Sequence, residues 1–178
     1  MKFEKVSKET FKKAMIDYVT KFKDVEKNKH AYTWINGIVF DSFDNIDIIP
    51  KRSTASSAGY DFRSPFSFNI KAGESIIVPT GIKVKLDPDK VLMIAPRSSI
   101  GIKKHLKLTN TQAYIDADYY NNPDNEGHIL LAITSENDKD ILIEAGDKIA
   151  QGIIIQYFTT EDDDCKNVRS GGIGSTGK

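Results

Sequence analysis

The sequence predicts an all-β domain of the sandwich or jelly-roll kind, with one helix at its N-terminal end. From residue 32 onward, short runs of β-branched and aromatic residues follow one another, and Gly, Pro, Asn and Asp separate them. No helical pattern lies between these runs, which favours sandwich and barrel architectures over βαβ folds. We therefore expect a helical extension over 1–31, a β domain over 32–158 and a flexible C-terminal arm over 159–178.

The helix is predicted over residues 7–27. Its apolar residues recur at helical spacing, with lysines between them: Phe11, Met15, Ile16, Val19, Phe22 and Val25. Ser7 is a suitable N-cap, and Val6 can pack against Phe11 across the first turn. We expect this helix to pack on the β domain or on a neighbouring subunit.

Ten strands are predicted, separated by turn signals such as Lys71-Ala72-Gly73 and Asp87-Pro88-Asp89. They are Thr33–Phe40, Ile46–Ile49, Ser67–Ile70, Ser75–Val78, Gly81–Leu86, Val91–Ala95, Gln112–Ile115, His128–Thr134, Ile141–Ile143 and Lys148–Phe158. Beyond Thr159 the sequence turns acidic and then glycine-rich, which is typical of a mobile arm without a core of its own.

Composition excludes several classes of function. The 178 residues suit one domain, and 25 basic against 25 acidic residues give no overall charge to favour nucleic acid or a membrane. We find no secretory signal and no apolar run of membrane-spanning length. The single cysteine, Cys165, lies among acids that disfavour a thiolate, and the three histidines lack metal-ligand spacing. A reducing, cytoplasmic compartment fits best.

Two carboxylates in the segment 110–127 are the first candidate site. If the segment is extended, Asp116 and Asp118 share one face, with Tyr119 directly after them. Such a pair taken alone is more typical of a polar hairpin facing water than of a catalytic site. Asn110 begins the same segment.

Two anion-binding candidates flank this segment in the sequence. Arg97, Ser98 and Ser99 follow a predicted strand and offer a planar guanidinium with two hydroxyls, or equally a polar turn with a surface ion pair. The glycine-rich end, RSGGIGSTGK, can wrap phosphate through backbone amides, but no strand precedes it and no helix follows, so a P-loop NTPase is rejected. A disordered tail is the alternative.

Two further polar residues sit in strand-like surroundings. Asp61 lies between aromatics in AGYDF, and Gln151 ends GDKIAQ among apolar neighbours, where its amide needs partners. Each is compatible with a purely structural role.

The five motifs taken in order carry a resemblance. AGYDF, PRSS, IDADY, GDKIAQ and RSGGIGSTGK resemble the ordered motifs of the trimeric dUTPases, from about Ile49 to Lys178. The resemblance implies a jelly-roll or β-clip fold, a homotrimer with shared active sites, and hydrolysis of dUTP to dUMP and pyrophosphate. That reaction keeps uracil out of DNA and supplies dUMP for thymidylate synthesis. Mg²⁺ would be held through the triphosphate and water, not by protein ligands.

Roles for single residues follow from the same resemblance. Asp116 would activate the attacking water, Arg97 would bind phosphate, and Asp61 would support the site or the magnesium's water shell. Tyr119 would pack under the deoxyribose and exclude a 2′-hydroxyl. The substrate contacts implied are Ser98, Ser99, Asn110, Ile115, Tyr119, Gln151, Arg169, Ile173, Gly174, Ser175 and Thr176.

Three departures from the family pattern bear on these roles. Ala113 stands where the family usually has Gly, the loop 120–126 is longer than the common form, and Ile173 replaces the aromatic that stacks on uracil. Weaker closure of the arm or slower turnover is expected from Ile173. The helix at 7–27 is additional to the family's core.

Other readings of the same scaffold are a dCTP deaminase, a regulatory protein switched by nucleotide, and a non-catalytic homologue. The D-x-D-Y pattern and the Gly-Ser-Thr arm fit the hydrolase better than the deaminase. A regulatory protein partner would contact the helix and the 120–126 loop.

Overall fold

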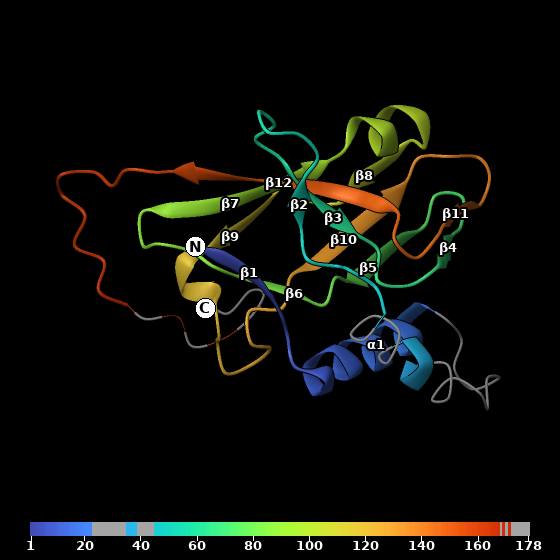
Figure 1. Ribbon diagram of the computed structural model, residues 1–178, viewed down its shortest axis with the longest axis horizontal. Coiled ribbons are helices and arrows are strands. Elements are labelled where there is room, and N and C mark those ends of the chain that lie inside the picture. The colour runs from blue at the N-terminus through green and yellow to red at the C-terminus, as the bar shows by residue number, and fades with distance from the viewer. Residues whose placement is uncertain (23–34, 39–44, 168, 170, 172–178) are drawn as a thin grey trace.

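The computed structural model describes residues 1–22, 35–38, 45–167, 169 and 171. Helix α1, a helical segment at 35–38 and twelve strands are assigned in these residues, with short helical turns at Ser99–Lys103 and Ala117–Tyr119 (Figure 1). They run in the order β1 (Lys2–Lys5), α1 (Lys8–Phe22), β2 (Lys51–Arg52), β3 (Tyr60–Arg63), β4 (Phe68–Ile70), β5 (Ser75–Pro79), β6 (Ile82–Lys85), β7 (Lys90–Pro96), β8 (Leu106–Leu108), β9 (Ala113–Asp116), β10 (Leu130–Ser135), β11 (Ile141–Ile143) and β12 (Lys148–Gln156).

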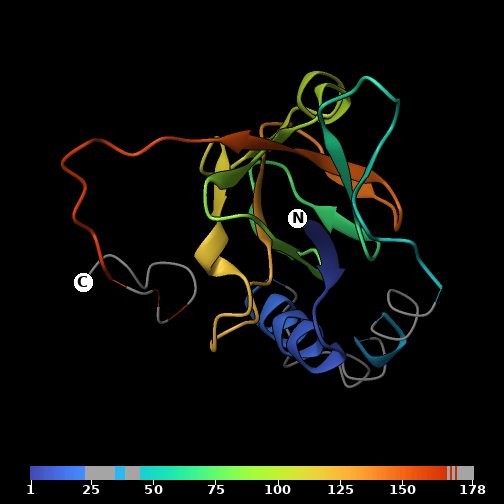
Figure 2. The ribbon, with the colours of Figure 1, turned by 60° about the vertical axis from the view of Figure 1, so that its left-hand side comes forward.

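The strands form four antiparallel sheets. The largest has the order β2-β3-β12-β7-β9, and it faces a second sheet of order β5-β10-β8 across the core (Figure 2). Two strand pairs, β1-β6 and β4-β11, complete the domain. Alternating residues along β5 and β10 are buried, for example Ile76, Val78, Leu131 and Ile133, which is the pattern of strands with one face on the core.

Helix α1 packs against β5 and closes one end of the β domain (Figure 1). Its buried face consists of Phe11, Met15, Tyr18 and Val19, which follow the period of a helix and join the same core as the strands. Ser7 is the N-cap, because its Oγ accepts the amide of Thr10 at 3.1 Å. The helix is confirmed over Lys8–Phe22, and the predicted residues 23–27 lie outside the described residues.

Several element predictions are wrong. Residues 35–38, predicted within a strand, are helical, since Ile35 and Ile38 recur at the spacing of one helical turn. Ile46–Ile49 forms no strand; Ile48 is fully buried, but the segment has no strand partner. The strands β1, β2, β3 and β8 are not among the ten predicted.

No helix among the described residues is long and apolar enough to span a membrane.

His128 lies where α1 meets the β domain. Its ring is 6.1 Å from that of Phe11, and its Nε2 accepts the Gly81 amide at 2.9 Å. The accepting nitrogen must be unprotonated, and burial lowers the pKa of His128 to about 4, against the weaker opposing effect of Glu126. This histidine therefore fills a packing role.

A pH dependence of stability follows from this buried histidine. In the unfolded chain His128 takes up a proton near pH 6.5, whereas in the folded chain it does so only near pH 4. Between these values the unfolded state binds more protons, so the free energy of unfolding falls by about 1.4 kcal/mol for each pH unit of acidification. His128→Gln keeps an acceptor for Gly81 and should lose this slope in urea titrations at pH 5 to 6.5.

His105→Asn serves as the control, because His105 is exposed. It should keep the wild-type slope. An unchanged slope in His128→Gln would show that this histidine does not titrate with folding.

Candidate active site

The central strand β12 aligns two of the predicted site residues. Gln151 lies opposite Asp61 of β3 on one side and opposite Ala95 of β7 on the other. Two residues after Ala95 the chain leaves β7 and presents Arg97, whose Nε lies 2.9 Å from Oδ1 of Asp61. Residues far apart in sequence are thereby brought together by strand pairing.

Asp61 holds two cations in place. Besides Arg97, the Nζ of Lys148 lies 2.7 Å from its Oδ2, and the Ser53 hydroxyl donates to the same oxygen at 2.6 Å. The Asp61 side chain is only 7% exposed. Burial raises the pKa of Asp61, but the hydrogen bonds from Lys148 and Ser53 and the charge of Arg97 together lower it below its ordinary value.

The two serines after Arg97 begin a helical turn. Ser98 and Ser99 are exposed, and the Arg97 carbonyl accepts the amides of Ile100 and Gly101 at 3.0 and 2.8 Å. Buried Ile100 anchors this turn in the core, so both hydroxyls are held at the surface beside the Arg97 guanidinium.

A cationic hollow of about 360 Å³ opens next to Asp61. Five of its lining side chains are basic: Arg63, Arg97, Lys103, Lys104 and Lys148. Among these, only Arg97 was predicted from the sequence. The lone acid of the lining, Asp147, pairs with Lys104 at 3.4 Å, so the hollow suits an anion such as phosphate.

Gln151 is half-buried and lies against Gly59. A Cβ at Gly59 would stand 3.0 Å from the Gln151 Oε1, which is tighter than ordinary packing. A glycine at this position therefore leaves room for the amide.

A second hollow, of about 220 Å³, lies at the other end of β7. It is lined by Asn110, Ala113, Tyr114, Ile115, Asp116, Tyr119, Ile129, Leu130 and Arg169. The strand β9 pairs with β7, with Asp116 opposite Val91, and the turn before β9 contains Thr111 at φ 65°. The lining of the hollow thus includes the turn before β9, several apolar side chains and the Asp116 carboxylate.

Tyr119 forms the buried side of this second hollow. Its hydroxyl donates to the His128 carbonyl at 3.2 Å and accepts from the Asn125 amide at 2.8 Å. Burial raises the pKa of Tyr119, outweighing the opposing effects of Asn125 and Arg169, so the ring stays neutral. Its position is fixed at both ends by hydrogen bonds.

Asp116 and Asp118 face the same cation. The strand ends at Asp116 and a helical turn follows, so the expected extended conformation through Asp118 is wrong. Even so, the Arg169 guanidinium reaches both carboxylates, with Nη2 2.8 Å from Asp116 and Nε 2.9 Å from Asp118. Its Cζ lies 5.5 Å from the centre of the Tyr119 ring.

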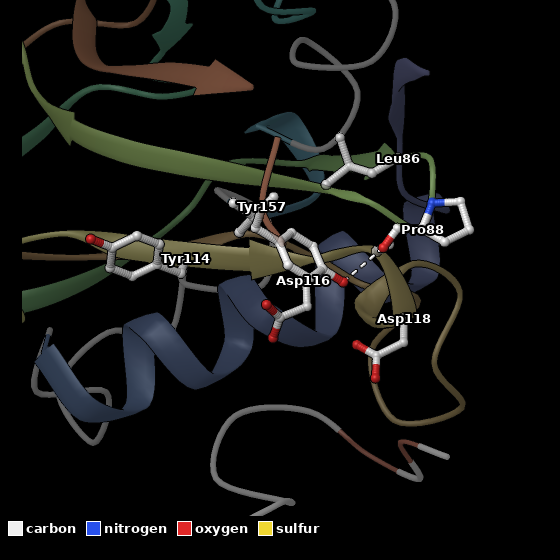
Figure 3. A pocket seen from close by; sticks show the side chains of 8 residues that line it. Leu86, Pro88, Tyr114, Asp116, Asp118 and Tyr157 are labelled. Atoms are coloured by element: carbon white, nitrogen blue, oxygen red, sulfur yellow. Dashed lines mark hydrogen bonds between the residues drawn. The ribbon is translucent and has the colours of Figure 1, made fainter. Parts of the chain in front are cut away.

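The same carboxylates border a larger, open hollow of about 720 Å³ (Figure 3). Tyr157, which follows β12, closes one side and donates its hydroxyl to the Pro88 carbonyl at 2.7 Å. Figure 3 shows Asp116 and Asp118 pointing toward the same side of the chain.

The predicted site residues thus form two groups. Asp61, Arg97, Ser98, Ser99 and Gln151 gather around one end of β7. The second group contains Asn110, Ile115, Asp116, Tyr119 and Arg169. The remaining predicted residues, Ile173, Gly174, Ser175 and Thr176, lie outside the described residues.

Comparison with known proteins identifies the family. The family model described as dUTPase matches residues 45–177. The chain belongs to the dUTPase family. The dUTPase family resemblance and the all-β fold class are both confirmed.

Individual dUTPases agree. The Lactococcus lactis deoxyuridine 5′-triphosphate nucleotidohydrolase is 42% identical over 131 residues, covering 72% of this chain and 87% of that protein. The Glaesserella parasuis protein of the same name is 32% identical over 138 residues, covering 73% and 87%. The crystal structure of the Streptococcus mutans dUTPase superposes with a TM-score of 0.65 at 31% identity, covering 90% of this chain and 99% of that one.

A phage dUTPase shares the fold. The phage phi11 dUTPase of S. aureus gives a TM-score of 0.56 at 22% identity, covering 68% of this chain and 90% of that one.

Removing the Asp61 charge should destabilise this dUTPase. Asp61→Asn leaves Arg97 and Lys148 without their shared carboxylate in a nearly buried position, and we expect unfolding free energy to fall by about 1–3 kcal/mol. Urea unfolding at pH 7 measures it.

Asp147→Asn is the matched control, since this half-exposed carboxylate pairs only with Lys104 among the described basic side chains. Its loss should stay below about 0.5 kcal/mol. Equal losses of unfolding free energy in the two variants would mean that Asp61 stabilises the fold no more than an ordinary surface carboxylate.

Proposed function

We propose that this chain hydrolyses dUTP to dUMP and pyrophosphate by attack of water on the α-phosphorus. The observation that carries the proposal is the pair of hollows at the two ends of β7, one lined by apolar groups and a carboxylate and one cationic. Membership of the dUTPase family and the names of its relatives support the same reaction.

The nucleoside would lie in the hollow between the 109–112 turn and Tyr119. Backbone groups of the turn beginning at Asn110 and of Ile115 would pair with the uracil edge, and cytosine would leave donors and acceptors mismatched. The deoxyribose would rest on the Tyr119 ring, where the Arg169 guanidinium now lies. Asp116 borders the hollow and is placed to hold the attacking water and accept its proton.

The triphosphate would be received by the cationic hollow. Arg97, with Ser98 and Ser99 beside it, would bind the α- and β-phosphates, and Gln151 would add an amide contact. Asp61 would act indirectly, by fixing Arg97 and Lys148. Cationic donors oppose the charge that develops as phosphorus is attacked.

Mg²⁺ would arrive with the triphosphate. Within the described residues no group of three or more His, Cys, Asp or Glu side chains could hold a metal ion, and both acids near the cationic hollow, Asp61 and Asp147, are already paired with basic side chains. When bound, the ion supplies charge neutralisation on the phosphate oxygens.

We infer that the two hollows of one subunit do not serve the same nucleotide. Asp116 lies opposite Val91, and Arg97 follows Val91 by six residues, directly after the end of β7 at Pro96. At about 3.3 Å per residue this separates the two by about 20 Å, whereas both must reach the same α-phosphate. A homotrimer with each site shared between subunits satisfies this requirement, and we propose that assembly here.

The arm would change partners during the reaction. Arg169 now neutralises Asp116 and Asp118, and a bound triphosphate offers it stronger acceptors. Its departure frees the Asp116 carboxylate for water. We propose a cytoplasmic location for the enzyme, in keeping with the reducing compartment expected from the sequence.

Pyrophosphate release from dUTP, dCTP, TTP and UTP, with Mg²⁺ and with EDTA, tests the reaction. We expect release from dUTP alone, dependent on Mg²⁺, and reduced about 100- to 10,000-fold in Asp116→Asn because the general base is lost. Deamination of dCTP, or full activity in Asp116→Asn, would contradict the proposal.

Mixing two inactive variants tests the shared site. Arg97→Ala and Asp116→Asn should each be inactive, and co-refolded trimers should regain about a quarter of wild-type activity, because one site in four then draws both intact residues from different subunits. A double variant, Arg97→Ala with Asp116→Asn, co-refolded with inactive Asp116→Asn, is the control and should regain none. No recovery in the first mixture would place both residues in one subunit.

A further inference from the structure

Glu126 joins the N-terminal extension to the loop that follows Tyr119. Its Oε2 accepts the Ser7 amide at 3.1 Å, and its Oε1 accepts the hydroxyls of Ser7 and Thr10, the latter at 2.6 Å. Lys83 from β6 adds an ion pair at 3.2 Å. The 120–126 loop and the N-terminal helix, which nothing in the sequence places in contact, are thus bound to each other.

The geometry is that of a helix capping box whose glutamate comes from elsewhere in the chain. In such a box the N-cap hydroxyl accepts the amide three residues on, and a Glu at that third position accepts the N-cap amide. Here Thr10 occupies the third position, so Ser7 makes the first bond and Glu126 makes the second. A carboxylate at a helix N-terminus is also favoured by the helix dipole.

Glu126 accepts enough hydrogen bonds to stay charged. Partial burial raises the pKa of Glu126, but the bonds from Ser7, Thr10 and Lys83 outweigh it and lower the pKa to about 2. Glu126 is therefore charged, and able to accept these hydrogen bonds, at neutral pH.

Hydrogen bonds within the loop connect Glu126 to Tyr119. The Glu126 amide donates to the Asn122 carbonyl at 3.0 Å, and the Asn122 side chain donates to the Tyr119 carbonyl at 2.8 Å. The Asn125 amide group holds the Tyr119 hydroxyl at 2.8 Å. Both ends of the tyrosine are therefore tied to a loop that Glu126 fixes.

The loop has little freedom to relax. Gly127 has φ +80°, and a Cβ there would lie 2.5 Å from the Tyr119 carbonyl oxygen. Asn121 and Glu126 also have positive φ, an uncommon conformation for non-glycine residues. A second tie lies alongside, where Tyr120 donates its hydroxyl to Glu4 of β1.

We propose that Glu126 is a positioning residue through which the N-terminal extension fixes the position of the Tyr119 ring. Because this ring would pack under the sugar, its position determines how well ribonucleotides are excluded. The proposal rests on the proposed function, since it concerns the sugar-binding side of that site. Asp116 is held independently by the pairing of β9 with β7, so the chemical step does not depend on Glu126.

Steady-state kinetics with dUTP and UTP test this role in Glu126→Gln, which keeps the shape but loses the charge. We expect kcat for dUTP within about twofold of wild type, a raised KM, and a ratio of kcat/KM for dUTP over UTP reduced about fivefold or more. Amide hydrogen exchange over residues 119–128 should speed up in parallel.

Variants on the helix side separate positioning from general destabilisation. Thr10→Val removes one donor to Glu126 and should shift selectivity in the same direction, whereas Thr10→Ser keeps the hydroxyl and should restore it. Glu9→Gln makes the same charge change at an exposed neighbouring position and should leave both readouts at wild-type values.

The outcomes distinguish the two proposals. Unchanged selectivity in both Glu126→Gln and Thr10→Val, even with lowered thermal stability, would reduce Glu126 to a structural anchor. A wild-type protein that releases no pyrophosphate from dUTP would overturn the proposed function instead, while the exchange rates would still show whether Glu126 controls the loop.

Discussion

The pairing of β12 on both of its edges is the constraint on which the site depends. One edge brings Asp61 to Gln151, and the other carries β7, which ends beside Arg97 and in turn holds β9 with Asp116. Nine residues of β12 thus fix the relative positions of residues from four separate stretches of sequence. Gly152 is part of this fit, because a Cβ there would lie 2.8 Å from the Leu92 side chain.

Charge is divided between the two ends of β7. One end gathers basic side chains around a single buried carboxylate, and the other presents two exposed carboxylates answered by one arginine from the C-terminal segment. The triphosphate of a nucleotide is negatively charged, so it would be attracted to the end of β7 where the basic side chains gather. In the proposed homotrimer, the opposite ends of two subunits would meet and form a site that neither subunit contains alone.

The sequence was informative where chemistry and strand pattern coincide. Asp116, Tyr119 and Arg97 were chosen as site candidates because their neighbours form ordered motifs. The strands β5, β7 and β12 were predicted because alternation marks strands with one buried face. Lys148 and Glu126 were not, since a lysine at a strand start and a glutamate in a loop acquire their roles only from partners distant in sequence. The strand β1 escaped prediction because its four residues lack a distinctive pattern and are stabilised by pairing with β6.

Cys165 gives the C-terminal segment a use in the laboratory. It is the only cysteine in the sequence, it is exposed, and it lies four residues before Arg169. A thiol-reactive fluorophore would therefore attach at one place without any engineered mutation. The label would stand on the chain between β12 and the two carboxylates, where its emission would report directly when Arg169 leaves them.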